Sequence, residues 1–145
     1  MSFDPVTDYP LGSRRPDLVR TPTGRPLDDV TLAAAREGKL AVADTRATAE
    51  TLGRQAEVAR AAGREQLATN LERAAQLSSS SAAELTGVDD DELLAIYTAL
   101  RPGRSTEDEL ETWAARLVEL GAPRNAAFVR EAAAVYVERG LLARG

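Results

Sequence analysis

Three clusters of acidic residues are the closest-spaced side chains in this sequence that could do chemistry. They are Asp28-Asp29, Asp89-Asp90-Asp91-Glu92 and Glu107-Asp108-Glu109. Neighbouring carboxylates can hold a divalent cation or take part in acid–base catalysis. Each cluster, however, stands where a helical pattern begins, and carboxylates there accept hydrogen bonds from free N–H groups and complement the helix dipole. The spacing of a calcium-binding loop is absent from "DDDELLAIYTAL". We therefore interpret the three clusters as helix caps and predict no metal site.

The sequence lacks the side chains on which most enzymes rely near neutral pH. Its 145 residues include no histidine and no cysteine, and Lys39 is the only lysine. Histidine is the usual general base and the commonest metal ligand in proteins. Without cysteine, the chain can have no thiol nucleophile and no disulfide. Glycine-rich phosphate loops do not occur either. These absences favour a chain without catalytic or cofactor-binding residues, and they leave an enzyme based on carboxylates as the alternative.

The charge distribution disfavours nucleic acids and membranes as partners. The net charge is -5, and an acidic body repels phosphate backbones. Arginines near the N-terminus (Arg14, Arg15, Arg20 and Arg25) are interleaved with aspartates (Asp4, Asp8 and Asp17), so this stretch is only weakly basic. No apolar run is long enough to span a bilayer, and the first residues lack the order of a signal peptide. We expect a cytoplasmic protein that binds other proteins.

Residues 1–27 differ from the rest of the chain in their high proline content. They contain Pro5, Pro10, Pro16, Pro22 and Pro26, and this spacing is too close for a helix to form between them. Apolar residues such as Tyr9, Leu11 and Leu27 are interspersed, which a solvated tail would not need. The pattern predicts an extended, proline-rich N-terminal arm over 1–27 that packs on a partner, followed by one helical domain over 28–145.

Helical patterns occupy most of the remaining chain. The predicted helices lie within 28–38, 48–63, 64–77, 89–103, 105–121 and 123–140. Thr48 is a plausible N-cap, and Ser105 or Thr106 followed by Asp108 or Glu109 has the spacing of a capping box. No run of alternating β-branched residues appears. We predict an all-α fold, a single domain of about six helices.

The last predicted helix has an unusually wide apolar face for a small domain. In "AAFVREAAAVYVERG", Phe128, Val129 and Tyr136 share that face with several alanines, and Arg139 projects from within it. Two interpretations of Arg139 remain open. Its long side chain could extend to water, or its guanidinium could meet a carboxylate on another chain.

Four segments together resemble the small (gamma) subunit of adenosylcobalamin-dependent diol dehydratase and glycerol dehydratase. They are "DYPLGSRRPDLVRTPTGRPLDDVTL" at 8–32, "TAETLGRQAEVARAAGREQLATNLERAA" at 48–75, "VDDDELLAIYTALRPGRST" at 88–106 and "AAFVREAAAVYVERG" at 126–140. They follow the order found in that family. Two departures stand out. Only seven residues precede "DYPL", which disfavours packaging in a bacterial microcompartment through this subunit, so packaging would act through other subunits. Ser78–Ser81 look like a surface insertion.

The resemblance implies a dimer of heterotrimers, each with a large, a medium and a small subunit. In this family a radical mechanism converts a 1,2-diol, propane-1,2-diol or glycerol, to an aldehyde and water. The large subunit holds the substrate, and adenosylcobalamin lies between the large and medium subunits, so the resemblance assigns no catalytic residue to this chain. Its implied role is to dock on the large subunit and stabilise it.

The predicted contacts with partner subunits come from the arm and the helical faces. Aromatic residues and arginine are favoured at the centres of interfaces. The candidates are Tyr9, Pro10, Leu11, Leu27, Arg101, Arg104, Phe128, Tyr136 and Arg139. The alternative to a dehydratase subunit is a free-standing helical adaptor or regulator derived from one.

Overall fold

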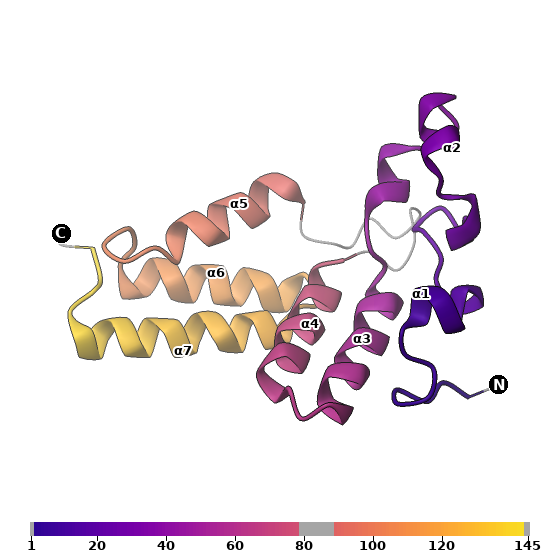
Figure 1. Cartoon of the computed structure of the whole chain (residues 1–145). Helices are drawn as coiled ribbons and strands as arrows, with labels where there is room; N and C mark the ends of the chain where they lie inside the picture. The colour runs from indigo at the N-terminus through magenta and orange to yellow at the C-terminus, as the bar shows by residue number, and fades with distance from the viewer. Residues whose placement is uncertain (1, 79–88, 144–145) are drawn as a thin grey trace. The chain divides into compact units, whose positions relative to one another are not determined.

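The computed structural model describes residues 2–78 and 89–143, and within them the fold is entirely helical (Figure 1). No strand occurs in this part of the chain, where the only β-type pairing is an isolated bridge between Arg20 and Pro26. The all-α prediction is confirmed. Of the predicted serine insertion, Ser79–Ser81 lie outside the described residues.

Seven α-helices form over these residues, one more than predicted. They are α1 (Leu11–Arg14), α2 (Leu32–Arg36), α3 (Ala49–Ala61), α4 (Glu65–Leu77), α5 (Asp90–Ala99), α6 (Glu107–Glu119) and α7 (Pro123–Arg139). Short 3-10 helices lie at Pro16–Leu18, Leu27–Asp29 and Val42–Thr45. The helix missing from the prediction is α1. It fits between Pro10 and Pro16 because a single turn that starts after Pro10 requires no N–H group from that proline.

The chain divides into two compact units, Met1–Leu85 and Thr86–Gly145. The division predicted from the sequence, an arm over 1–27 and a helical domain over 28–145, stays a prediction. The first unit contains α1 to α4 and the second contains α5 to α7, so the helices that follow the proline-rich stretch are shared between the two units.

The core of the first unit is a helical hairpin built on alanines. Helices α3 and α4 pack against each other, and Ala56, Ala59 and Ala68 are buried between them with Leu71 at their edge. Small side chains allow two helices to approach closely. The turn between them contains Gly63, whose φ of 73° lies in the left-handed region that glycine adopts without strain.

Residues 2–27 belong to this first unit and include helical turns, so the predicted arm is not extended along its whole length, and its packing on a partner stays a prediction. Besides α1 and the 3-10 turn at Pro16–Leu18, this stretch forms a turn in which the Thr21 amide donates to the carbonyl of Arg25 at 2.9 Å. Arg54 on α3 reaches back, and its Nη1 donates to the carbonyl of Leu18 at 2.6 Å. The prolines prevent long helices in this stretch, but the backbone between them can still form hydrogen bonds with side chains such as that of Arg54.

The second unit is built around larger apolar side chains. Leu110 and Leu117 of α6 and Val129 of α7 are each 1% exposed, and these two helices form the main contact of the unit. Helix α5 packs on α6 and buries Ile96. Pro123 occupies the first turn of α7, as predicted, and Gly140 ends the helix with a φ of 65°.

Two of the three acidic clusters cap helices, as predicted. The Asp89 carboxylate accepts the amide of Glu92 at 2.7 Å, and Thr106 with Glu109 forms the expected capping box. The first cluster does not cap α2. Asp28 and Asp29 lie in a separate 3-10 turn, and α2 begins at Leu32 because the Thr31 hydroxyl accepts the amide of Ala34. Thr48 caps α3 as predicted.

Candidate functional site

The acidic clusters provide no chemistry beyond capping in the part of the chain that is described. Among residues 2–78 and 89–143, no group of three or more acidic side chains is placed to hold a metal ion. Over the same residues, no helix has the length and apolar character needed to cross a membrane.

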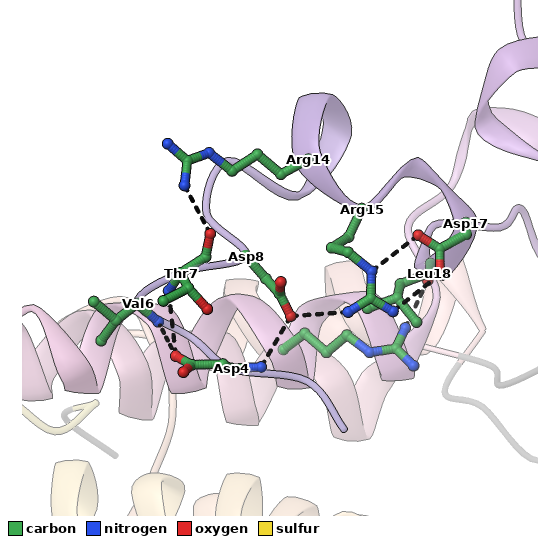
Figure 2. Close-up of polar contacts among 9 residues, drawn as sticks. Asp4, Val6, Thr7, Asp8, Arg14, Arg15, Asp17 and Leu18 are labelled. Atoms are coloured by element: carbon green, nitrogen blue, oxygen red, sulfur yellow. Dashed lines mark hydrogen bonds and ion pairs between the residues drawn. The ribbon is translucent and has the colours of Figure 1, made fainter. Parts of the chain in front are cut away.

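Residues 4–17, called the N-terminal wall, are fixed on the first unit by hydrogen bonds between side chains and backbone (Figure 2). The Asp4 carboxylate accepts the amides of Val6 at 2.8 Å and Thr7 at 3.2 Å, while the amide of Asp4 donates to Asp8 at 3.0 Å. Arg14 Nη1 donates to the carbonyl of Thr7 at 2.8 Å. The amides of Val6 and Thr7 lower the pKa of Asp4, because they stabilise its ionised form.

An arginine joins the two ends of this stretch. Figure 2 shows Arg15 between two aspartates, with Nη1 at 2.9 Å from Asp8 and Nη2 at 3.0 Å from Asp17. The hydrogen bond from Arg15 is the main cause that lowers the pKa of Asp17. The turn that holds Val6 is thereby tied to the residues that follow α1.

A buried carboxylate organises the middle of the first unit. Asp44 is 5% exposed and accepts hydrogen bonds from the hydroxyls of Thr21 and Thr23 and from the amide of Ala41, with the bonds from Thr21 and Ala41 at 2.7 and 2.8 Å. The Thr23 hydroxyl contributes most to holding the pKa of Asp44 at about 2, below its usual 3.8. Arg25 Nε lies 3.7 Å from the same carboxylate. The group is fully hydrogen-bonded, so its role is to fix the turn.

A groove with a volume of about 670 Å³ lies between the N-terminal wall and the α3–α4 hairpin. The N-terminal side contributes Pro5, Val6 and Tyr9, and the hairpin contributes Val58 and Leu67 among its lining residues. Val6 is 70% exposed, Tyr9 57% and Leu67 43%. Three of the exposed large apolar side chains of this unit therefore line one groove, as the surface of a protein-binding site does.

The predicted contact residues of the N-terminal stretch differ in their exposure to solvent. Tyr9 and Pro10 are exposed on the groove, so both are accessible to a partner. Leu11 is 7% exposed and packs within its own unit, and Leu27 is half-buried. Leu11 is therefore an internal anchor of the wall, and the contact prediction stays a prediction for all four residues.

In the second unit, the predicted arginines surround the turn between α5 and α6. Arg101 and Arg104 are exposed, and the Arg104 amide donates to the carbonyl of Arg101 at 3.1 Å. The chain after α7 secures this turn, since the amide of Gly103 donates to the carbonyl of Leu141 at 2.7 Å. The two guanidinium groups are thus presented from an ordered turn.

The wide apolar face of α7 is divided between core and surface. Val129 and Ala133 are buried, whereas Phe128 is 41% exposed and Val137 49%. Tyr136 is half-buried, and its hydroxyl donates to the carbonyl of Leu100. Packing on α6 thus explains part of the face.

Arg139 is exposed in the last turn of α7. A cation there complements the partial negative charge of the helix C-terminus. This placement agrees with a side chain directed to water, and it also leaves the guanidinium accessible to a carboxylate of another chain.

Ion pairs on the second unit join its helices at the surface. Arg130 of α7 pairs with Glu111 of α6 at 2.6 Å and lowers the pKa of that carboxyl. Arg116 of α6 pairs with Glu92 of α5 at 2.9 Å. All four groups remain accessible to solvent, so these pairs contribute orientation more than stability.

A family model and two similar proteins point to one family for this chain. The family model described as "Dehydratase small subunit" matches residues 5–143. A propanediol dehydratase small subunit from Citrobacter freundii is 53% identical over 135 residues, which cover 92% of this chain and 74% of the relative. The propanediol dehydratase small subunit from Salmonella typhimurium is 50% identical over 135 residues, with coverage of 92% and 73%.

Proposed function

Because the chain belongs to the dehydratase small-subunit family, we propose that it is the small subunit of a complex that dehydrates propane-1,2-diol. The observation that carries the proposal is identity of 50% and more to two propanediol dehydratase small subunits over 92% of the chain. In the overall reaction, the diol loses one molecule of water and becomes the aldehyde. Both relatives are named for propanediol, so this substrate is placed before glycerol.

The proposed role of the chain is to dock on the large subunit and stabilise it. The side chains of the chain support this division of labour. Asp44 is fully hydrogen-bonded inside a turn, Asp89 and Glu109 cap helices, and Glu111 is paired with Arg130. These four carboxylates thus have structural tasks, and the chain has no histidine or cysteine to take a catalytic role.

Adenosylcobalamin is assigned to the large and medium subunits rather than to this chain. The chain has no histidine or cysteine to ligate cobalt, and the groove of the first unit has an apolar lining with Arg64 as its one charged side chain among the described residues. These residues do not fit the cofactor. When bound by the partner subunits, it supplies the radical chemistry of the reaction.

Co-purification tests the proposal directly. This chain, with an affinity tag, is co-expressed with a large and a medium dehydratase subunit, and the eluate is assayed for aldehyde formation from propane-1,2-diol with added adenosylcobalamin. We expect all three chains in the eluate together with the activity, in the stoichiometry of a dimer of heterotrimers. Recovery of this chain alone, with full activity in the flow-through, contradicts the proposal and favours a free-standing adaptor.

A further inference from the structure

The groove of the first unit is a preformed apolar site that the fold of this unit leaves open. On one side it is bounded by Pro5, Val6 and Tyr9, and on the other by Val58, Leu67 and Leu71. Its volume of about 670 Å³ falls in the range of pockets that enclose a group of a few side chains or a small ligand. It is too small to hold a whole domain, so only a short segment or a small ligand can enter it.

Both walls of the groove are held in place without an occupant. The Asp4 carboxylate fixes the turn that carries Val6, and Arg14 closes that turn by donating to the carbonyl of Thr7. The opposite wall is the α3–α4 hairpin, whose alanine core is buried. A site that is already ordered loses little conformational entropy when it binds, which favours tight association.

The exposed apolar side chains indicate what such a segment must bring. Val6, Tyr9 and Leu67 are each more than 40% exposed, at 70%, 57% and 43%, although they line the same groove. Removing apolar surface from water is favourable in proportion to the area buried. A complementary segment therefore carries apolar side chains on the face that enters the groove.

The charge on the groove adds a second requirement. Arg64 is the single charged residue among the described residues of its lining, and it is exposed. In the described part of the chain, the neighbouring carboxylate of Glu65 is engaged by Arg60 at 3.1 Å, and no ion pair joins Arg64 to an acidic side chain. A partner carboxylate would complete the charge balance at this end of the groove, because arginine binds carboxylates in a bidentate manner.

We propose that this groove receives a short segment of another dehydratase subunit, with apolar side chains that cover Val6, Tyr9 and Leu67 and an Asp or Glu that pairs with Arg64. The inference rests on the proposed function, since it names the chemistry of the segment that the small subunit holds. It assigns docking to the N-terminal wall and the α3–α4 hairpin together.

Photo-crosslinking in the assembled complex tests the occupant. A photoreactive p-benzoyl-phenylalanine replaces Leu67 in the groove, and in the matched control it replaces Leu32, which is 66% exposed on α2 and outside the groove. We expect the probe at position 67 to link to one peptide of a partner subunit, with apolar residues beside an acidic one. The probe at position 32 should not link to that peptide.

The outcomes separate the groove from the proposed function. If the tagged chain brings down no partner, the proposed function fails. If the complex assembles and the probe at 67 links only to its own chain, to a second copy or to nothing, the groove is not the docking site. A crosslink from position 67 to a small apolar molecule in place of a peptide also contradicts the proposal.

Two substitutions measure the contribution of the groove to affinity. Leu67→Asp and Arg64→Glu should each weaken binding to the partner by about tenfold or more, as a residue at the centre of an interface does. Leu32→Asp and Arg36→Glu are the controls on α2 and should change affinity by less than about twofold. Unchanged amide exchange in α3 and α4 confirms that each variant is folded. Equal effects of test and control variants would contradict the assignment.

Discussion

Different interactions stabilise the inside of each of the two units. In the Met1–Leu85 unit, the helical hairpin has an alanine core, and the irregular stretches are fixed by hydrogen bonds from side chains such as Asp4 and Asp44. In the Thr86–Gly145 unit, Leu110, Leu117 and Val129 form a core of larger apolar side chains. The difference shows that polar contacts can order a proline-rich chain where apolar burial is too small to do so.

This difference also bears on function. The polar contacts hold Val6 and Tyr9 at the surface, next to a groove, while the second unit buries Leu110, Leu117 and Val129 and leaves other apolar side chains such as Tyr97 and Phe128 exposed on its helices. A unit that is ordered by polar side chains can leave apolar ones available to a partner. If the comparison is correct, substitutions in the two units should change stability by different amounts. Trp113 fluorescence should detect those in the second unit, and amide hydrogen exchange those in the first.

The largest effect is expected from the core of the second unit. Leu117→Ala removes most of a side chain that is 1% exposed, and such truncations cost about 2–5 kcal/mol because a cavity remains. The measurement is urea unfolding followed by the fluorescence of Trp113, the only tryptophan, which lies on α6. The adjacent Val118 is 49% exposed, so Val118→Ala is the control. Similar losses for both variants would show that this core does not hold the unit.

The next effect tests the tight packing of the first unit. Ala68 is fully buried between α3 and α4, so Ala68→Leu should destabilise the hairpin by about 1–3 kcal/mol through overpacking. Amide hydrogen exchange of α3 and α4 detects it, since Trp113 belongs to the other unit. Ala61→Leu, at an exposed position on α3, serves as the control. A stabilised Ala68→Leu variant would contradict tight packing around Ala68.

A smaller effect is expected from the cap of α6. Thr106→Ala removes the hydroxyl that accepts the Glu109 amide at 3.3 Å, which should cost about 1 kcal/mol. Thr112→Ala, at an exposed position within the same helix, is the control and should be neutral or slightly stabilising. Urea unfolding with Trp113 fluorescence measures both. No difference between the two variants would mean that the capping box does not stabilise α6.

The last effect, that of Asp44→Asn, is the one that becomes smallest in acid. At neutral pH the amide oxygen can still accept a hydrogen bond, but the NH2 group faces a donor that the carboxylate accepts, so the variant should be destabilised. Its signature is in acid. The pKa of Asp44 is lowered from 3.8 to about 2, so the folded unit binds its proton less readily than the unfolded chain does. This contribution to stability is complete above about pH 4 and is lost as the pH falls towards 2.

Amide exchange of the first unit between pH 4 and pH 2 checks this prediction. The wild-type chain should lose protection over that interval, and the Asp44→Asn variant should lose less. The same slope in both chains would show that Asp44 is not linked to the stability of the unit. Asp28→Asn, at an exposed acidic position of the same unit, controls for the change in net charge.

Local patterns were sufficient to predict the helices but not the fold of the N-terminal stretch. Helices α3 to α7 follow from apolar periodicity and from caps such as Thr48 and Thr106, which act on neighbouring residues. The turn around Asp44 depends on Thr21 and Thr23, more than 20 residues earlier in the chain. No local pattern indicates which distant hydroxyls a carboxylate will accept.

The same limit applies to the candidate contact residues. An apolar or aromatic residue indicates an anchor, but its type does not say whether the anchor is internal. Leu11 and Tyr136 proved to be anchors within their own units, whereas Tyr9 and Phe128 are exposed. The groove residues Val58, Leu67 and Arg64 could not be identified as a site, because the groove exists only once the N-terminal stretch is folded against α3 and α4.

Aldehyde formation in reconstituted preparations tests the central claim most directly, namely that this chain contributes a surface to the dehydratase and no chemistry. Propane-1,2-diol and adenosylcobalamin are supplied to this chain alone, to the large and medium subunits alone, and to all three chains. We predict no aldehyde from this chain alone, and the most stable and active preparation when all three are present. Turnover by the purified chain alone, or full activity and stability of the other subunits without it, would contradict the account.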